Sequence, residues 1–210
     1  MKEVTTILLI RHGMTDAVGY QLVGWTPGVG LNEKGRAEVE RLGQNLAGVR
    51  LDAIYSSPLD RARQTAEAVA GHHGLHVTFR DDLGEVKFGD WTGLLLAEVE
   101  PDPRWHAWNA CRSTAGTPNG ETYLELQDRM VSELTRIAAA HPNGTVAVVS
   151  HADSLRAALL QFLGMPGDFC LRLAVRPASV SVAQLGDGPP RVLAVNIPVN
   201  GWDGLLPGRQ

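Results

Sequence analysis

Near its N-terminus the sequence reads Thr6-Ile7-Leu8-Leu9-Ile10-Arg11-His12-Gly13. A later stretch of the same kind reads Thr145-Val146-Ala147-Val148-Val149-Ser150-His151. Each is a short apolar run, as expected for a strand buried on both faces of a sheet, and each ends in a histidine. Because ligands of open α/β sheets bind beyond the carboxyl ends of the strands, the pattern predicts that His12 and His151 meet at one edge of the sheet.

Strand-like and helix-like segments alternate along the rest of the chain. The further predicted strands lie at 51–55, 76–80, 178–185 and 191–197. Four helices are predicted. The first begins after Asn32, and the second begins after Ser57 with Pro58 in its first position. The third spans 121–140, and the fourth includes the apolar positions of 155–163. This alternation predicts one α/β domain over residues 1–210. We expect a three-layer α/β/α sandwich with a mostly parallel central sheet, in which at least one of the last two strands runs antiparallel.

The stretch 87–120 interrupts this alternation. It contains Trp91, Trp105 and Trp108 among glycines and prolines, and it shows no clean period. We expect a cap-like insertion that covers one end of the sheet, because irregular segments of this kind often shape a binding site. The tryptophans are expected to pack rather than to form a ligand cage, with Trp25 as a candidate for the border of the pocket.

The composition excludes several classes of partner. The chain has 210 residues, 44% of them hydrophobic, and a net charge of -4 without a basic stripe, so we expect neither nucleic acid nor a membrane surface as partner. Cys111 and Cys170 are too few for a disulfide scaffold, and the aliphatic run before Arg11 is too short for a signal peptide. The expected setting is cytoplasmic. The sequence says little about oligomeric state, and a homodimer is one option.

Positive charge gathers around the two histidines. Arg11 precedes His12, and Arg61 lies in the first turn of the helix after Ser57, where free backbone N–H groups and the helix dipole attract anions. Arg63 lies on another side of that helix. Two arginines with two imidazoles suit a phosphoryl dianion and repel a metal cation.

Four motifs occur in a characteristic order: Arg11-His12-Gly13, the segment 56–66, Glu85 ahead of 88–93, and Ser150-His151. The segment 118–122 adds a fifth, weaker match. With these motifs the chain resembles branch 1 of the histidine phosphatase superfamily, which is phosphoglycerate mutase-like. The resemblance implies the phosphoglycerate mutase-like fold and a phosphohistidine mechanism that uses neither a cofactor nor a metal.

The resemblance also implies a role for each motif residue. His12 becomes phosphorylated, Glu85 protonates the departing oxygen, and the contacts to phosphate or substrate come from Arg11, Gly13, Thr15, Arg61, His151 and Ala152. The residue types support these roles, because arginines beside a histidine disfavour its cation and keep it nucleophilic, while a neighbouring dianion raises the pKa of a carboxylic acid. A simpler alternative is that Glu85 pairs with Lys87. Glu85 is also the weakest of the catalytic assignments, because Asp81, Asp82 and Asp90 are carboxylic acids close to it in the sequence.

Three positions depart from the family pattern. Met14 stands where Glu is frequent, and Val18 stands where an Asn commonly contacts phosphate, a hydrogen bond that Val18 cannot make. Ala152-Asp153 follows His151 where glycine is usual, and Asp153 is expected either to cap the next helix or to touch the substrate. These departures bear on the identity of the substrate more than on the phosphohistidine step.

The expected function is hydrolysis of a small phosphorylated metabolite, since the insertion before Glu121 looks short for a mutase that must retain a bisphosphorylated intermediate. A phosphomutase is the alternative within the same chemistry. A metal-dependent hydrolase would instead use His12, Asp16, His151 and Asp153 as ligands. A binding module for phosphorylated ligands, without turnover, is the alternative that Met14 and Val18 keep open.

Overall fold

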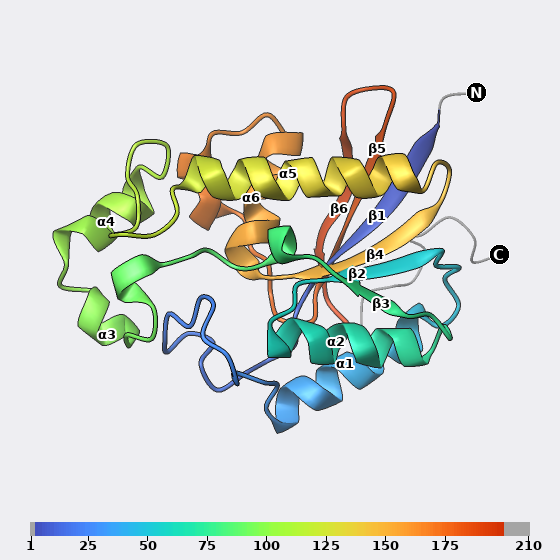
Figure 1. Cartoon of the computed structure of the whole chain (residues 1–210), viewed down its shortest axis with the longest axis horizontal. Coiled ribbons are helices and arrows are strands. Elements are labelled where there is room, and N and C mark those ends of the chain that lie inside the picture. The colour runs from blue at the N-terminus through green and yellow to red at the C-terminus, as the bar shows by residue number, and fades with distance from the viewer. Residues whose placement is uncertain (1–2, 200–210) are drawn as a thin grey trace.

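The strand β1 (Val4–Arg11) occupies the middle of the sheet in the computed structural model, which describes residues 3–199 (Figure 1). The sheet order is β3-β2-β4-β1-β5-β6. The other strands are β2 (Ala53–Ser56), β3 (Val77–Phe79), β4 (Thr145–Ser150), β5 (Val180–Gly186) and β6 (Arg191–Ile197). Neighbouring strands from β3 to β1 pair in parallel, whereas β5 pairs antiparallel with both β1 and β6. The predicted mostly parallel sheet with an antiparallel strand near its end is confirmed.

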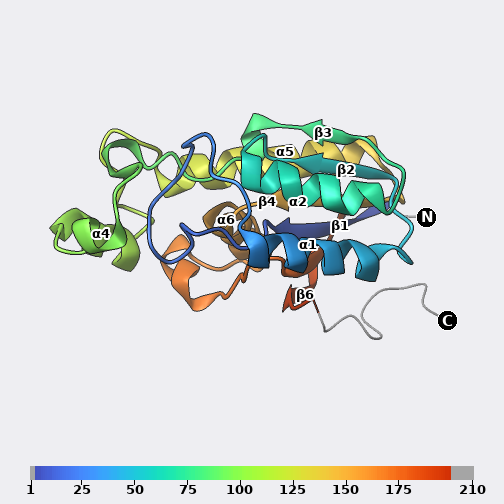
Figure 2. The same ribbon diagram turned by 90° about the horizontal axis from the view of Figure 1, so that it is seen from below.

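Helices cover both faces of this sheet (Figures 1 and 2). On one face lie α1 (Glu33–Leu46) and α2 (Asp60–Gly71), and on the other lie α5 (Tyr123–Ala140) and α6 (Ala152–Phe162). The side chains of β1 alternate between the two layers. Leu8 and Ile10 pack in the core with α1 and α2, while Ile7 and Leu9 pack in the core with α5 and α6. Burial on both faces explains the unbroken apolar run, and the predicted three-layer α/β/α arrangement is confirmed.

One helix begins later than the sequence predicts. We expected Ser57 to cap α2 and Pro58 to open it, but the helix begins at Asp60 and its N-cap is Leu59. The reason is that β2 continues through Ser56, and the Ser57 N–H donates to Val149 O of β4 at 3.0 Å. Sheet pairing therefore holds Ser57 in the extended conformation. Arg61 still falls in the first turn of α2, as predicted.

The segment 87–120 lies beyond the carboxyl ends of the parallel strands (Figure 1). It is more regular than its composition suggests, because it contains α3 (Leu96–Val99) and α4 (Pro103–Ala110). The start of α4 has a recognisable sequence pattern, because Asp102 caps the helix and Pro103 takes its first position. Trp91 and Trp108 are buried in the core, in agreement with the expected packing role.

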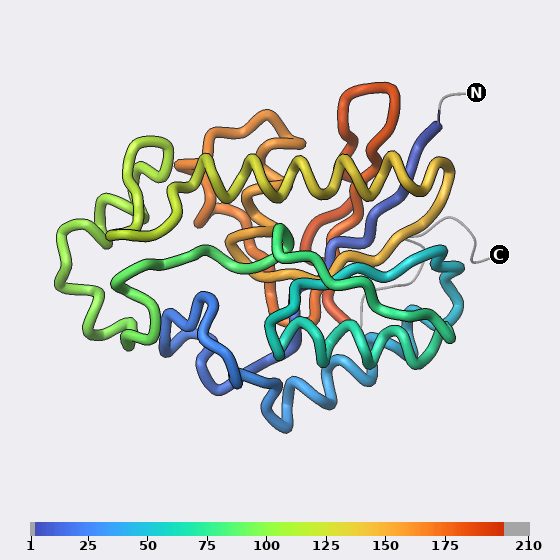
Figure 3. Tube along the Cα trace, in the orientation of Figure 1, coloured from blue at the N-terminus to red at the C-terminus, as the bar shows by residue number. Residues whose placement is uncertain are grey.

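A loop of the N-terminal part runs beside this segment (Figure 3). The Leu22 N–H donates to Leu94 O, the Gly93 N–H donates to Leu22 O, and the Leu96 N–H donates to Tyr20 O. Backbone pairing thus joins the loop after β1 to the segment 87–120. No helix within residues 3–199 has both the length and the apolar character needed to cross a membrane.

The start of α1 presses closely on the loop after His12, which gives a first prediction. A Cβ at Gly35 would lie 2.0 Å from the Met14 carbonyl oxygen, so Gly35→Ala forces the loop or the helix to move. We expect the free energy of unfolding in urea to fall by about 1–3 kcal/mol. Gly71→Ala is the control, because nothing lies within 4 Å of a Cβ there, and it should change stability by less than about 1 kcal/mol. Equal effects of the two variants would contradict the close approach.

Candidate active site

Two neighbouring strands bring the predicted histidines together. Arg11, the last residue of β1, is paired in register with Ser150, the last residue of β4. The next residue on each strand is His12 or His151, and the His12 N–H donates to Ser150 O at 3.0 Å. The two ring centroids lie 5.2 Å apart. Residues separated by most of the chain are therefore in contact, as the strand pattern predicted.

Hydrogen bonding and burial define the state of His12. Its Nδ1 lies 2.7 Å from the carbonyl oxygen of Gly13, which can only accept, so Nδ1 carries the proton and the Nε2 lone pair is free. Burial lowers the pKa of His12 well below its usual value, and the charges of Arg11 and Arg61 lower it further, against a smaller opposing effect of the Gly13 hydrogen bond. His12 is consequently a neutral imidazole at physiological pH, with a nucleophilic nitrogen available.

The proton position on His151 follows from its neighbour. Its Nε2 lies 2.8 Å from Ser57 Oγ, and Ser57 Oγ also accepts from the Leu59 N–H at 3.3 Å. Because the Leu59 N–H already uses one lone pair of Ser57 Oγ, we assign the Ser57 hydroxyl proton to the bond with Nε2 and the ring proton of His151 to Nδ1. Burial lowers the pKa of His151 well below its usual value, helped by Arg61 and His12. Ser57, expected only as a helix cap, is therefore a supporting residue of this site.

Of the two predicted arginines near His12, Arg61 is buried and Arg11 is half-buried. Arg61 Nη2 donates to Gly24 O at 2.9 Å, and Arg11 Nη1 donates to Val175 O at 2.7 Å. Burial lowers the pKa of both groups, that of Arg11 to about 10, so each remains a cation near neutral pH. Each guanidinium is held by one backbone carbonyl and keeps other donors available.

Four buried polar atoms around the histidines lack a hydrogen-bond partner within residues 3–199: Arg11 Nε, Thr15 Oγ1, Arg61 Nη1 and His151 Nδ1. Arg11, Thr15 and Arg61 line a pocket of about 130 Å³ together with His12. Buried donors without partners are unfavourable and rare in folded proteins. Three donor nitrogens and a hydroxyl beside a neutral imidazole form a set that matches a tetrahedral oxyanion.

Glu85 lies in the wall of the same pocket. Its Oε1 accepts from the Val86 N–H at 3.0 Å and from Ser154 Oγ at 3.2 Å. Burial raises its pKa, and the nearby charge of Asp153 raises it further, while Val86, Arg61 and Arg11 act in the opposite direction. The alternative pairing with Lys87 is not seen, because Lys87 Nζ lies 5.5 Å above the ring of Trp25.

The remaining predicted contacts lie around the loop after β1. Thr15, Val18 and Ala152 line the pocket. The Gly13 N–H donates to Thr65 Oγ1 at 3.1 Å, and the Gly13 carbonyl accepts from His12, so Gly13 acts by orienting the histidine. Met14 is not among the described residues that line the pocket.

The arrangement of acids does not resemble a metal centre. Asp16 accepts from Asn32 Nδ2 at 2.9 Å and does not line the pocket. Asp153 is bound by Arg112 at 2.9 Å and by Arg156 at 2.8 Å, and its pKa lies at about 2 because these cations outweigh the effect of burial. The positive charges of Arg112 and Arg156 beside these oxygens disfavour the binding of a metal cation there. Nowhere in residues 3–199 do three His, Cys, Asp or Glu side chains come together as metal ligands.

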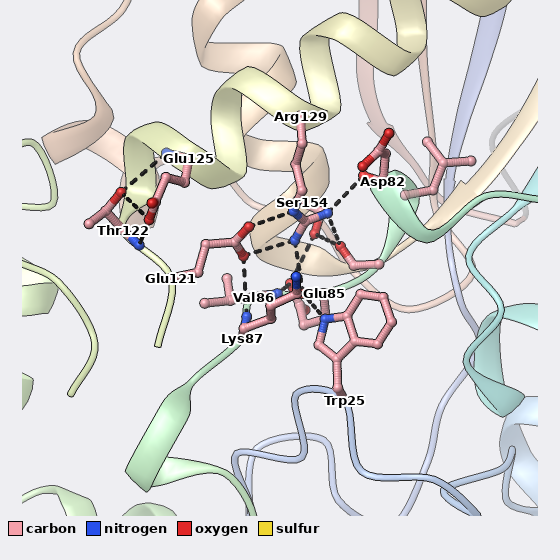
Figure 4. A network of polar contacts seen from close by, with 12 residues as sticks. Trp25, Asp82, Glu85, Val86, Lys87, Glu121, Thr122, Glu125, Arg129 and Ser154 are labelled. Atoms are coloured by element: carbon pink, nitrogen blue, oxygen red, sulfur yellow. Dashed lines mark hydrogen bonds and ion pairs between the residues drawn. The ribbon is translucent and has the colours of Figure 1, made fainter. Parts of the chain in front are cut away.

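Arg129 of α5 holds the loop that carries Glu85 (Figure 4). Its Nε and Nη2 donate to Glu121 at 2.6 and 2.9 Å, and its Nη1 donates to the carbonyls of Asp82 and Gly84 at 2.7 and 2.8 Å. Its Nη2 also reaches Glu85 O at 2.9 Å. A guanidinium can supply these divergent donors, whereas an ammonium cannot. No pattern in the sequence points directly to this role, because Arg129 resembles the other polar residues of a long helix.

The network of Arg129 leads to a second prediction. Arg129→Lys keeps the charge but loses the planar set of donors, so the free energy of unfolding in urea should fall by about 1–3 kcal/mol. Arg136→Lys on the same helix is the matched control. Arg136 is 62% exposed and pairs with Asp82 and Glu133, so this change should stay within about 1 kcal/mol. A larger effect at position 136 than at 129 would contradict the assignment.

Comparisons with known proteins agree with this geometry. A family model described as the histidine phosphatase superfamily (branch 1) matches residues 7–198. The chain is 34% identical over 197 residues to the bifunctional protein Rv2228c of Mycobacterium tuberculosis, covering 91% of this chain and 54% of that protein. It is 31% identical to phosphoserine phosphatase 1 of Hydrogenobacter thermophilus, covering 91% and 92%.

Solved structures give the same result. Bacillus stearothermophilus YhfR superposes with a TM-score of 0.85 at 29% identity, covering 90% of this chain and 96% of that one. This chain spans about half the length of the mycobacterial relatives it matches. The family model nevertheless extends over nearly the whole sequence. The chain belongs to branch 1 of the histidine phosphatase superfamily.

Proposed function

We propose that this chain hydrolyses small phosphomonoesters through a phosphohistidine formed on His12. The observation that carries the proposal is the group of unpartnered donors of Arg11, Thr15, Arg61 and His151 around a neutral imidazole. Such donors stabilise the charge on the phosphoryl oxygens in the transition state. The resemblance to a phosphoserine phosphatase supports the same class of reaction.

In the first half-reaction, His12 Nε2 attacks phosphorus and the bond between phosphorus and the ester oxygen breaks. Arg11, Arg61 and His151 bind the phosphoryl oxygens, with Thr15 and Ala152 in the pocket wall and Gly13 orienting the nucleophile. Glu85 gives its proton to the departing oxygen, and the alcohol leaves. The raised pKa of Glu85 supports this role, because a general acid must be protonated before the reaction.

In the second half-reaction, water attacks the phosphohistidine. The Glu85 carboxylate takes one proton from the water, the bond between Nε2 and phosphorus breaks, and inorganic phosphate is released with His12 neutral again. The covalent intermediate divides one difficult displacement into two easier ones.

Hydrolysis is favoured over the phosphomutase alternative by the charges in the pocket wall. Within residues 3–199, Arg11 and Arg61 are the only arginines that line the pocket, and both lie near His12. A mutase intermediate carries a second phosphoryl group that needs cations of its own, whereas the other charged side chains of this wall are Glu85 and Asp153. The neutral nucleophile and the raised pKa of Glu85 likewise favour turnover over simple ligand binding.

We place this activity in the cytoplasm and assign the segment 87–120 to a cap within a single domain. The thiols of Cys111 and Cys170 are both free, which suits a reducing compartment. Phe88 from this segment lines the pocket, which suits a cap. A homodimer stays a prediction from the sequence.

The proposal is tested with p-nitrophenyl phosphate. We expect hydrolysis that resists chelators and is inhibited by vanadate, and His12→Ala should lower kcat/KM by at least about 10³-fold, because the nucleophile is lost. His106→Ala, at an exposed position of α4, should leave the rate unchanged. Loss of activity with chelator and recovery with zinc or manganese would favour the metal-dependent alternative. Phosphate binding without turnover would favour the binding module.

The role of Glu85 is tested by pH and by the leaving group. Because Glu85 acts when protonated, kcat/KM should fall as pH rises through its raised pKa, and Glu85→Gln should remove this limb of the profile. The substitution should slow an alkyl phosphate by about 10²–10⁴-fold but p-nitrophenyl phosphate much less, since nitrophenolate leaves without a proton. Glu100→Gln, at an exposed position, is the control. Equal losses on both substrates would argue against the acid role.

A further inference from the structure

Asp153 is a pocket residue that the phosphoryl-transfer step does not use. It is the second residue of α6, directly after Ala152, and it lines the pocket near Glu85. The adjacent Ser154 hydrogen-bonds both Gly84 O and the Glu85 carboxylate. Asp153 therefore lies on the side of the pocket where the alcohol departs, next to the group that protonates it.

Two arginines hold the Asp153 carboxylate in place. Arg156 Nη1 donates to Oδ1 at 2.8 Å, and Arg112 Nη1 donates to Oδ2 at 2.9 Å. Arg112 is itself fixed, with its guanidinium 4.6 Å from the ring centroid of Trp108, and Arg156 Nε donates to Leu173 O at 2.8 Å. The carboxylate cannot turn away from the pocket without breaking these contacts.

The arginines lie behind the carboxylate and not in the pocket. The side chain of Arg112 is 2% exposed, and neither Arg112 nor Arg156 is among the residues of the pocket wall. Asp153 Oδ1 accepts from Arg156 and also from the Cys170 thiol at 4.0 Å, whereas Oδ2 keeps a lone pair beyond the one that Arg112 uses. A ligand in the pocket consequently meets a fixed anionic hydrogen-bond acceptor. The pKa of Asp153, about 2, keeps this acceptor ionised throughout the physiological range.

The rest of the wall away from His12 is uncharged. It consists of short and apolar residues with one amide, namely Ala17, Val18, Gly19, Gln21, Leu22, Val23 and Phe88. Within the described residues, this part of the wall holds no lysine or arginine. A carboxylate on the alcohol portion of a substrate would meet Asp153 and find no cation to pair with.

We propose that Asp153 selects phosphomonoesters whose alcohol carries a hydrogen-bond donor, a hydroxyl or an ammonium, and discriminates against those whose alcohol carries a carboxylate. This inference rests on the proposed hydrolysis and names the class of its substrates. Val18 fits this assignment, because its apolar side chain adds no polar group to the same wall. Asp153 then stands as the anionic acceptor of this wall, beside the proposed acid Glu85.

The experiment uses four esters of similar size: 2-aminoethyl phosphate, 2-hydroxyethyl phosphate, propyl phosphate and phosphoglycolate. With the unmodified protein, at least one of the two donor-bearing esters should exceed propyl phosphate in kcat/KM by about tenfold, and phosphoglycolate should rank last. The first two esters distinguish an ammonium from a hydroxyl. Phosphoglycolate equal to or better than propyl phosphate would overturn the inference.

The variant Asp153→Asn makes the test specific to this side chain. The preference for the donor-bearing ester over phosphoglycolate should fall by about tenfold or more, because the asparagine is neutral and both donates and accepts. Asp16→Asn is the matched control, since Asp16 lies outside the pocket wall and its bond to Asn32 survives through the amide oxygen. An unchanged preference in a folded Asp153→Asn protein would overturn the inference.

The outcomes separate this inference from the proposed function. If Asp153→Asn does not fold, the ranking of the four esters by the unmodified protein decides the matter alone. Hydrolysis of p-nitrophenyl phosphate with no ranking among the four esters overturns the selection by Asp153 and leaves the phosphatase proposal intact. Failure to hydrolyse any ester, including p-nitrophenyl phosphate, overturns both.

Discussion

The parallel pairing of β1 with β4 is the constraint on which the site depends. Arg11 stands opposite Ser150, so the following histidines emerge side by side at the same edge of the sheet. Both strands are buried on both faces, and a slip of one residue would exchange the two sets of apolar side chains between layers of different shape. Core packing thus fixes the distance between the His12 and His151 rings, although neither ring belongs to the core.

Burial of charge gives this site its chemistry. Arg61 is buried and Arg11 is half-buried, and the carbonyls of Gly24 and Val175 satisfy only part of each guanidinium. The same environment keeps His12 neutral and raises the pKa of Glu85, since a low dielectric disfavours a cationic imidazole and an anionic carboxylate alike. A single physical condition therefore suits both the proposed nucleophile and the proposed acid, and a bound dianion would offset the unfavourable burial of charge.

The sequence predicted the parts of the site that depend on strands and helix starts. Apolar runs located β1 and β4, and the helix pattern placed Arg61 in the first turn of α2. Local signals failed where tertiary pairing decides the structure: Ser57 reads as a helix cap but is held at the end of β2 by Val149. The roles of Arg112 and Arg129 could not be predicted from local patterns. Their partners Asp153 and Glu121 are brought to them by tertiary packing, and no periodic spacing in the sequence indicates these pairs. The sequence interpretation did not include α4, although Asp102-Pro103 is a typical start of a helix, with an N-cap residue followed by proline.

The bond between Arg112 and Asp153 has a consequence for how such an enzyme diversifies. Arg112 follows α4 in the segment 87–120, yet it governs the orientation of a side chain that belongs to α6. Insertions or deletions in that segment would withdraw Arg112 and leave Arg156 as the remaining arginine on the carboxylate, with no substitution among the wall residues themselves. The range of substrates that we propose for this pocket could then change with loop length, while the proposed phosphoryl chemistry, which depends on the strand ends, stays the same.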